Sequence, residues 1–276
     1  MSGTRTTNRA WTIARTDLRQ LRQARDFWMP LVIIASLFFI VIPGFLLLII
    51  TRVSNVELAQ QLSDVVGALP TKIQEHVKGD SGPVQASYAL AVYLFAPLAI
   101  VVPLTVSSAV GANTIIGERE RGSGEFLAHS PASEREIYLG KLIAALIPGY
   151  VTAFVGFGCY SLIVNLLVGP KVGGWFFPTA NWWWLMLWVL PPFIMLALAM
   201  ILAISARVSS AAAAQQSSAL VTLPLILIAY SVASGSMYKG SVVAIVIGAL
   251  AWLGAGIALL RASRTVSRER LLGMGA

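Results

Sequence analysis

Charged residues are scarce in this chain. Only 12% of its 276 residues are Asp, Glu, Lys or Arg, whereas 57% are apolar. A soluble globular domain is about one quarter charged and nearly half apolar. So few charged side chains cannot cover a globule of this size, which excludes a soluble enzyme, a coiled coil and a disordered binding protein. Segments of about 20 apolar residues that cross a bilayer account for this composition. The sequence therefore predicts an all-α polytopic membrane protein.

Residues that carry catalysis or bind metals are equally rare. The single cysteine, Cys159, lies in an apolar run, so the chain cannot form an internal disulfide. Both histidines, His76 and His129, stand in polar loops without matched ligands. There is no H-E-x-x-H zinc motif and no G-x-S-x-G nucleophile motif. The phosphate-binding motif G-x-x-x-x-G-K-[ST] is also absent, because Gly140-Lys141 lacks the upstream glycine. We expect no active site, metal site or cofactor in this chain.

Ionisable residues are absent from six apolar stretches, each long enough to cross a bilayer as a helix. Helices are expected because unpaired backbone polar groups are not tolerated against lipid. An ionisable side chain at membrane depth is the usual mark of a proton relay or an ion site, so its absence argues against a proton-coupled carrier. The six stretches are 28–50, 87–116, 142–168, 182–206, 210–234 and 241–260.

Lys and Arg are unevenly distributed between these stretches. If the N-terminus lies inside, 15 of the 20 Lys and Arg residues fall in cytoplasmic segments. Cytoplasmic loops typically carry this excess, so both termini are predicted to be cytoplasmic. The net charge of +8 then reflects topology rather than nucleic-acid binding. We expect an interfacial cytoplasmic segment at 1–27, a six-helix transmembrane domain at 28–260 and a basic cytoplasmic tail at 261–276.

The segment before the first stretch has the pattern of an amphipathic helix. Its apolar residues recur near helical spacing, and its arginines occupy other faces. A helix of this kind lies in the membrane interface. Two interpretations are open: an anchor that only fixes topology, and a helix that also contacts a partner. The apolar residues are Trp11, Ala14, Leu18, Leu21 and Trp28, and the arginines are Arg15, Arg19, Arg22 and Arg25.

The loop at 117–137 concentrates charge between two uncharged stretches. It holds five acidic residues and three arginines. The Gly-Ser-Gly run at 122–124 favours a break in the helix, and the short helix expected after it ends before Pro131. Ser133 and Glu136 then have the spacing of a capping box that opens the third stretch. A solvated linker does not need a rigid, capped elbow, so a docking surface explains this pattern better than a solvated loop.

This loop resembles the signature loop of type-2 ABC transporter permeases, usually G-E-R-E-x-G-T-x-E-x-L-L-x-x-P-x-S-R-x-E-I-x-x-G-K. Here it reads GERERGSGEFLAHSPASEREIYLGK. It departs from the pattern at Ser123, at Ala128-His129 and at Glu134, where threonine, apolar residues and a basic residue are usual. The run at 214–217 also resembles the family's cytoplasmic start of the fifth helix. The matching residues are Gly117, Glu118, Arg119, Glu120, Gly122, Glu125, Leu127, Pro131, Ser133, Glu136, Ile137, Gly140 and Lys141.

The resemblance implies a division of labour between chains. In that family the loop is a coupling helix seated in a cleft of a separate ATPase, which carries ATP and Mg²⁺. Two permease chains, identical or different, join two ATPase chains. The implied function is export of a hydrophobic or amphipathic substrate, such as a drug-like molecule, a lipid or a glycolipid, across the plasma membrane, without nucleic acid. The residues implied in ATPase coupling are Gly117, Glu118, Arg119, Glu120, Arg121, Gly122, Glu125, Phe126, Leu127, Pro131, Ser133 and Glu136.

Two other functions stay open. A permease-like subunit that transmits force, for instance in lipoprotein handling or metalloenzyme maturation, would need a large external domain or partner, and the outer segment 51–86 is short. An ATP-independent channel or secondary carrier would transport without any ATPase. In the outer segment, Leu58, Leu62, Val65 and Leu69 have helical spacing, which fits a short external helix or a solvated connector equally well.

Overall fold

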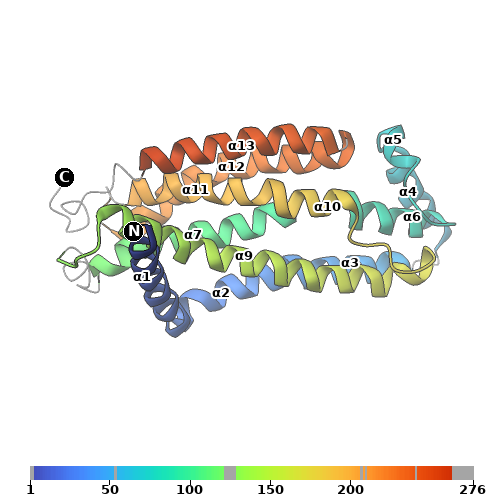
Figure 1. Cartoon of the computed structure of the whole chain (residues 1–276). Coiled ribbons are helices and arrows are strands. Elements are labelled where there is room, and N and C mark those ends of the chain that lie inside the picture. The colour runs from blue at the N-terminus through green and yellow to red at the C-terminus, as the bar shows by residue number, and fades with distance from the viewer. Residues whose placement is uncertain are drawn as a thin grey trace.

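The computed structural model describes residues 3–52, 55–120, 129–205, 208, 210–239 and 241–262, and all regular elements in these ranges are helical. Long helices run side by side, and the N-terminal helix lies across one end of them (Figure 1). The elements are α1 (Gly3–Gln23), α2 (Arg25–Ser36), the π-helical turn η1 (Leu37–Val41), α3 (Ile42–Thr51), α4 (Val56–Gly67), α5 (Thr71–Gln74), α6 (Gly82–Ala89), the π-helical turn η2 (Leu90–Leu94), α7 (Leu98–Glu120), α9 (Glu134–Leu167), the 3₁₀ turn η3 (Gly169–Lys171), α10 (Ala180–Trp184), the π-helical turn η4 (Leu185–Val189), α11 (Leu190–Ser205), α12 (Ala211–Lys239) and α13 (Ser241–Ala262).

Several helices are long and apolar enough to cross a membrane, as the sequence predicts. Within the described ranges, three spans meet this description: Arg25–Thr51, Glu134–Lys171 and Ala180–Ser205. The pair Gly82–Leu94 and Leu98–Thr114, bent by 40°, adds a fourth if it forms one span. α12 and α13 carry shorter apolar segments. The chain is therefore a helical membrane protein, whereas the six crossings and the side on which the termini lie stay predictions.

The bend between η2 and α7 comes with specific side-chain hydrogen bonds. The helix is interrupted at residues 95–97, where Pro97 has no backbone N–H to donate. The Tyr160 hydroxyl donates to the Ala91 carbonyl at 2.6 Å, and the Trp182 indole N–H donates to the Val92 carbonyl at 2.9 Å. Both aromatic side chains are almost fully buried. These donors from α9 and α10 satisfy backbone groups that could not stay unpaired inside a membrane.

A buried amide makes most of the side-chain hydrogen bonds that hold the chain between α9 and α10. Asn165 lies near the end of α9 and is 2% exposed. Its Nδ2 donates to the Phe177 carbonyl at 2.6 Å and to the Ser161 carbonyl at 2.9 Å. Its Oδ1 accepts from the backbone N–H groups of Phe176 and Phe177 at 3.0 and 3.1 Å. All the hydrogen-bonding groups of this amide therefore serve the fold at this end of the bundle.

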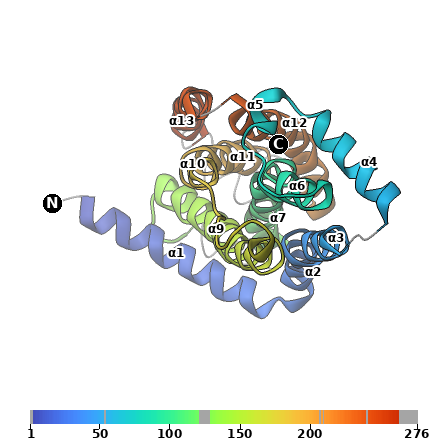
Figure 2. The same ribbon diagram turned by 90° about the vertical axis from the view of Figure 1, so that its right-hand side faces the viewer.

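Residues 56–67 of the 51–86 segment form helix α4. Of the two interpretations of this segment, a short helix or a solvated connector, the helix is the correct one. Asn55 caps its first turn. Leu62 and Leu69 pack against the buried core, while Leu58 and Val65 are exposed. The helix lies against α6, at the end of the bundle opposite α1 (Figures 1 and 2).

Candidate functional site

The predicted capping box at the start of α9 is confirmed. The backbone N–H of Ser133 donates to Glu136 Oε2 at 2.6 Å, and the Ser133 hydroxyl accepts from the Glu136 backbone N–H at 3.3 Å. α9 has 34 residues, about 51 Å of helix, whereas the hydrocarbon core is about 30 Å thick. Part of this helix must therefore extend beyond a core of that thickness, and its charged first turn is the part that lipid tolerates least. Hydrogen bonding from the Ser133 backbone, with help from Arg9, lowers the pKa of Glu136 below its ordinary value.

Only part of the predicted coupling loop falls within the described residues. Gly117, Glu118, Arg119 and Glu120 belong to the last turns of α7. Pro131, Ser133 and Glu136 lie where the chain enters α9. The break and short helix expected at 122–128 lie outside the described residues, and with them Arg121, Gly122, Glu125, Phe126 and Leu127. The docking role of this loop stays a prediction.

Helix α1 packs against the start of α9 and does not simply lie in the interface. Its buried face contains Ala10 and Ala14, which are 4% and 0% exposed. Gly140 of α9 is essential to this contact, because a Cβ there would lie 2.8 Å from Ile13 Cβ and 2.9 Å from the Ala10 carbonyl oxygen. Glycine thus lets the two backbones approach closely. This contact explains why the sequence motif has glycine at position 140.

The buried face of α1 differs from the apolar face that the spacing predicts. Trp11 was assigned to that face but is 51% exposed. Leu18 and Leu21 are half-buried. The buried face is instead the one that carries Ala10, Ile13 and Ala14, of which Ala10 and Ile13 contact Gly140 of α9 directly. The predicted basic residues Arg15, Arg19 and Arg22 are exposed, as expected.

A buried ion pair joins α1 to α9. Lys141 Nζ lies 3.1 Å from Asp17 Oδ2, and the two side chains are 1% and 9% exposed. The same ammonium group donates to the Thr114 carbonyl of α7 at 3.0 Å. Burying a charge is costly unless it is paired and hydrogen-bonded, as it is here. Lys141 therefore connects three helices directly beneath the predicted loop.

Arg9 provides a second contact between α1 and the end of the loop. Its Nη1 donates to the Pro131 carbonyl at 2.8 Å and lies 4.0 Å from Glu136 Oε2. Arg9 and Asp17 are eight residues apart on one helix, a rise of about 12 Å. α1 thus contacts the exit of the loop at one point and the base of the loop at another.

The sequence interpretation missed Asp17 altogether and treated Lys141 only as a topological charge and as a motif residue. Asp17 follows Ala10 and Ala14 at helical spacing, on the stripe that becomes buried. A lone acid on the small-residue stripe of an otherwise basic helix is the signal that could have identified it. Its partner on α9 is not visible from local sequence.

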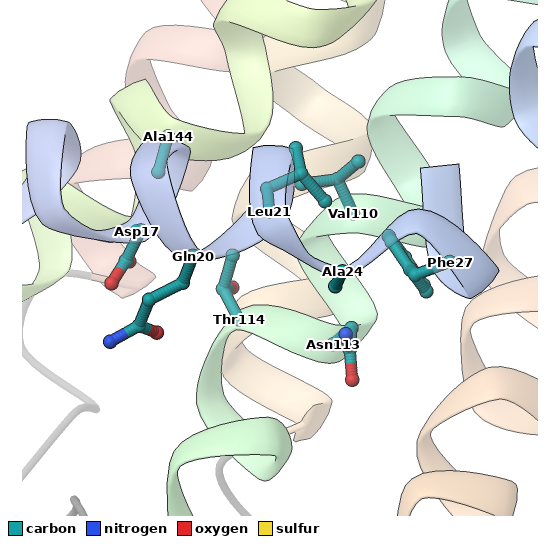
Figure 3. A pocket seen from close by; sticks show the side chains of 9 residues that line it. All are labelled: Asp17, Gln20, Leu21, Ala24, Phe27, Val110, Asn113, Thr114 and Ala144. Atoms are coloured by element: carbon teal, nitrogen blue, oxygen red, sulfur yellow. The ribbon is translucent and has the colours of Figure 1, made fainter. Parts of the chain in front are cut away.

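A small pocket lies between α1, α7 and α9 beside the ion pair (Figure 3). Asp17 and Gln20 of α1 and Asn113 and Thr114 of α7 provide its polar lining. Its volume of about 40 Å³ is enough for about three water molecules but not for an organic ligand. This pocket is therefore a polar space between helices that water can fill, and it is too small to be a substrate site.

A second hollow lies between α7 and α12. It has a volume of about 220 Å³ and no charged side chain in its lining. The Ser218 hydroxyl of α12 donates to the Ser108 carbonyl of α7 at 3.3 Å, which ties the two helices together at its base. Its lining residues are Thr105, Ser108, Ala109, Gln215, Ser218, Ala219, Thr222, Leu223 and Ile226. We call this hollow the α7–α12 groove.

Comparison with protein families identifies the family of this chain. The family model described as ABC-2 family transporter protein matches residues 11–249. These residues run from the middle of α1 to the first part of α13 and include the 117–137 loop. No curated protein matches the chain.

Proposed function

Because the chain belongs to the ABC-2 family of transporter proteins and is a permease subunit of an ABC transporter, we propose that it exports a hydrophobic or amphipathic substrate across the plasma membrane. In this proposal a separate ATPase, bound to the 117–137 loop, hydrolyses ATP with Mg²⁺. Two permease chains, identical or different, and two ATPase chains form the working transporter.

The ion pair beneath the loop is the observation that carries this proposal. Lys141 contacts Asp17 of α1 and the Thr114 carbonyl of α7. Any force on the loop therefore acts on α1, α7 and α9 together. α1 is also tied to the next helix, because the Trp28 indole N–H donates to the Arg22 carbonyl at 3.2 Å. A displacement at the loop thus has a packed path to the span that begins at Arg25 and to the two spans that flank the loop.

Such a path suits a transporter that alternates between two packings of rigid helices. Packed interfaces switch between discrete arrangements rather than deform continuously, so a small movement at one end becomes a larger movement of the bundle. ATP binding and hydrolysis in a partner would shift the balance between the two arrangements. The substrate would then move between two permease bundles, along apolar helix faces such as that of α12.

The exposed face of α12 supports this placement of the substrate. Leu220, Leu223 and Leu227 are 74%, 58% and 69% exposed. Lipid tails or a second permease bundle can cover these leucines and so keep them out of water. A hydrophobic cargo that enters from the bilayer can travel along the same face.

The test is a charge reversal in the loop. Glu118 and Glu125 together are replaced by Lys, and the tagged chain is purified in mild detergent from the membranes of its own host. We expect the wild-type chain to co-purify with a Walker-motif ATPase and to show measurable MgATP hydrolysis. The double variant should lose most of the bound ATPase and most of the hydrolysis while still inserting in the membrane. The matched control reverses Asp64 and Glu75, two exposed acids at the opposite end of the bundle, and should keep both. Equal ATP hydrolysis in the two double variants would reject the docking role.

A further inference from the structure

The α7–α12 groove contains hydroxyl groups that the fold does not use. Ser108 and Thr222 are 3% and 4% exposed, and both line the groove. Neither the Ser108 hydroxyl nor the Thr222 hydroxyl has a hydrogen-bond partner in the described part of the chain. A buried hydroxyl without a partner is unfavourable, so each of these groups has an unmet need for one.

These two hydroxyls differ from ordinary serines and threonines of membrane helices. Such side chains usually bond to the carbonyl three or four residues earlier in their own helix. Thr105, in the same groove, does so: its hydroxyl donates to the Val101 carbonyl at 2.8 Å. Ser108 and Thr222 do not, although both stand in helices that offer such carbonyls. The groove is therefore lined by two residues with buried hydroxyls whose hydrogen bonds the described part of the chain leaves unmade.

The lining also excludes charge. Gln215 adds an exposed amide at one end of the groove, and Leu223 and Ile226 add apolar surface at the other. A cationic or anionic group placed here would leave water without a counter-charge, which is costly at membrane depth. A neutral group with hydroxyl or carbonyl oxygens would instead exchange hydrogen bonds with water for hydrogen bonds with the groove.

The groove is large enough for only part of a lipid-sized molecule. Pockets that enclose a drug-sized ligand measure roughly 300–1,000 Å³, and the groove measures about 220 Å³. It can therefore take a compact polar headgroup, while an acyl chain extends along the exposed leucines of α12 into lipid. In the proposed transporter this is where a cargo from the adjacent leaflet would enter.

We propose that the α7–α12 groove selects an uncharged amphiphile whose headgroup carries hydroxyl or carbonyl groups, and that Ser108 and Thr222 bind this headgroup. The proposal rests on the proposed function only for the step that follows binding, namely ATP-driven export. Binding itself needs this chain alone.

The experiment measures binding to the purified chain in lipid nanodiscs. Two fluorescent probes with the same two acyl chains are compared: a hexosyl diacylglycerol, which is neutral and rich in hydroxyls, and a diacyl-trimethylammonium-propane, which is cationic. We expect the glycolipid to bind the wild-type chain more tightly than the cation. Thr222→Val and Ser108→Ala should each weaken glycolipid binding about three- to tenfold, the loss of one neutral hydrogen bond. Thr105→Val is the matched control and should change it less, because that hydroxyl is already bonded to its own helix.

Two results would overturn the proposal. The first is equal binding of the two probes, or glycolipid binding that neither variant at Ser108 and Thr222 alters. The second is no binding of either probe together with altered dimer dissociation in Thr222→Val, which would assign the groove to a second copy of the chain. Adding the ATPase and measuring ATP-dependent probe movement tests the proposed function separately. Binding without such movement would reject the export proposal and leave the binding proposal standing.

Discussion

Replacing Lys141 with Met tests the junction of α1, α7 and α9 most quantitatively. At a separation of 3.1 Å and an effective dielectric constant of about 20, the attraction between Lys141 and Asp17 is about 5 kcal/mol. The variant leaves Asp17 buried and unpaired, and removing one partner of a buried pair typically costs about 3–5 kcal/mol. We expect Lys141→Met to lower the free energy of unfolding by that amount. Asp17→Leu should cost a similar amount, because it leaves the buried ammonium without its carboxylate.

The double variant Asp17→Leu/Lys141→Met separates pairing from general damage. Apolar residues of similar volume often replace a buried ion pair at little cost. The double variant should therefore be more stable than either single variant. Unfolding is followed in mixed micelles with increasing denaturing detergent, and the four proteins form a double-mutant cycle.

The control for this cycle is Arg135→Met, which removes an exposed positive charge from the first turn of α9. It should change the free energy of unfolding by less than about 0.5 kcal/mol. If the two single effects at Asp17 and Lys141 simply add in the double variant, the two groups act independently, and the account of a shared junction is wrong.

Three further predictions concern the close contact, the amide and the capping box. Gly140→Val should displace α1 and speed tryptic cleavage at its arginines, since the new side chain would collide with α1. Gly158→Val, with open space around it, should leave cleavage unchanged, and equal cleavage in both variants would argue against the contact. Asn165→Leu removes four hydrogen bonds and should cost about 2–4 kcal/mol in thermal or detergent unfolding; an unchanged midpoint would show that the amide does not hold the loop. Glu136→Gln should lower the free energy of unfolding at pH values above the ordinary glutamate pKa, because the native state favours the charged carboxylate. The difference in unfolding free energy between variant and wild type should shrink as pH falls through the lowered pKa of Glu136, and a difference that is the same at all pH values would contradict this cause.

Local sequence patterns predicted the elements of this fold well. The apolar stretches correspond to long helices because a membrane forces each segment to satisfy its own backbone. The Ser133–Glu136 capping box was predictable because both partners lie within one turn. A proline such as Pro97 favours a kink wherever it stands in a helix, but the donors Tyr160 and Trp182, which satisfy the backbone beside this one, come from distant helices. Contacts of that kind depend on how helices pack and leave no local pattern.

The candidate site was predictable only in part for the same reason. The charged loop was recognisable from its own residues, and the amphipathic character of α1 from its periodicity. The exact face of α1 was predicted wrongly at Trp11, because hydrophobicity was weighed without the steric requirement that Gly140 imposes. Asp17 and Lys141 are 124 positions apart, and only the tertiary structure brings them together.

The most direct test of the central claim is a photo-crosslink from the middle of the 117–137 sequence. A photoreactive amino acid is placed at Phe126 in the full-length chain in its native membrane, and at Trp175, which is 71% exposed at the opposite end of the bundle, as the control. The account predicts a crosslinked product between position 126 and a Walker-motif ATPase, and none from position 175. No ATPase in the product from position 126, or the same product from both positions, would contradict the claim that this loop couples the permease to its ATPase.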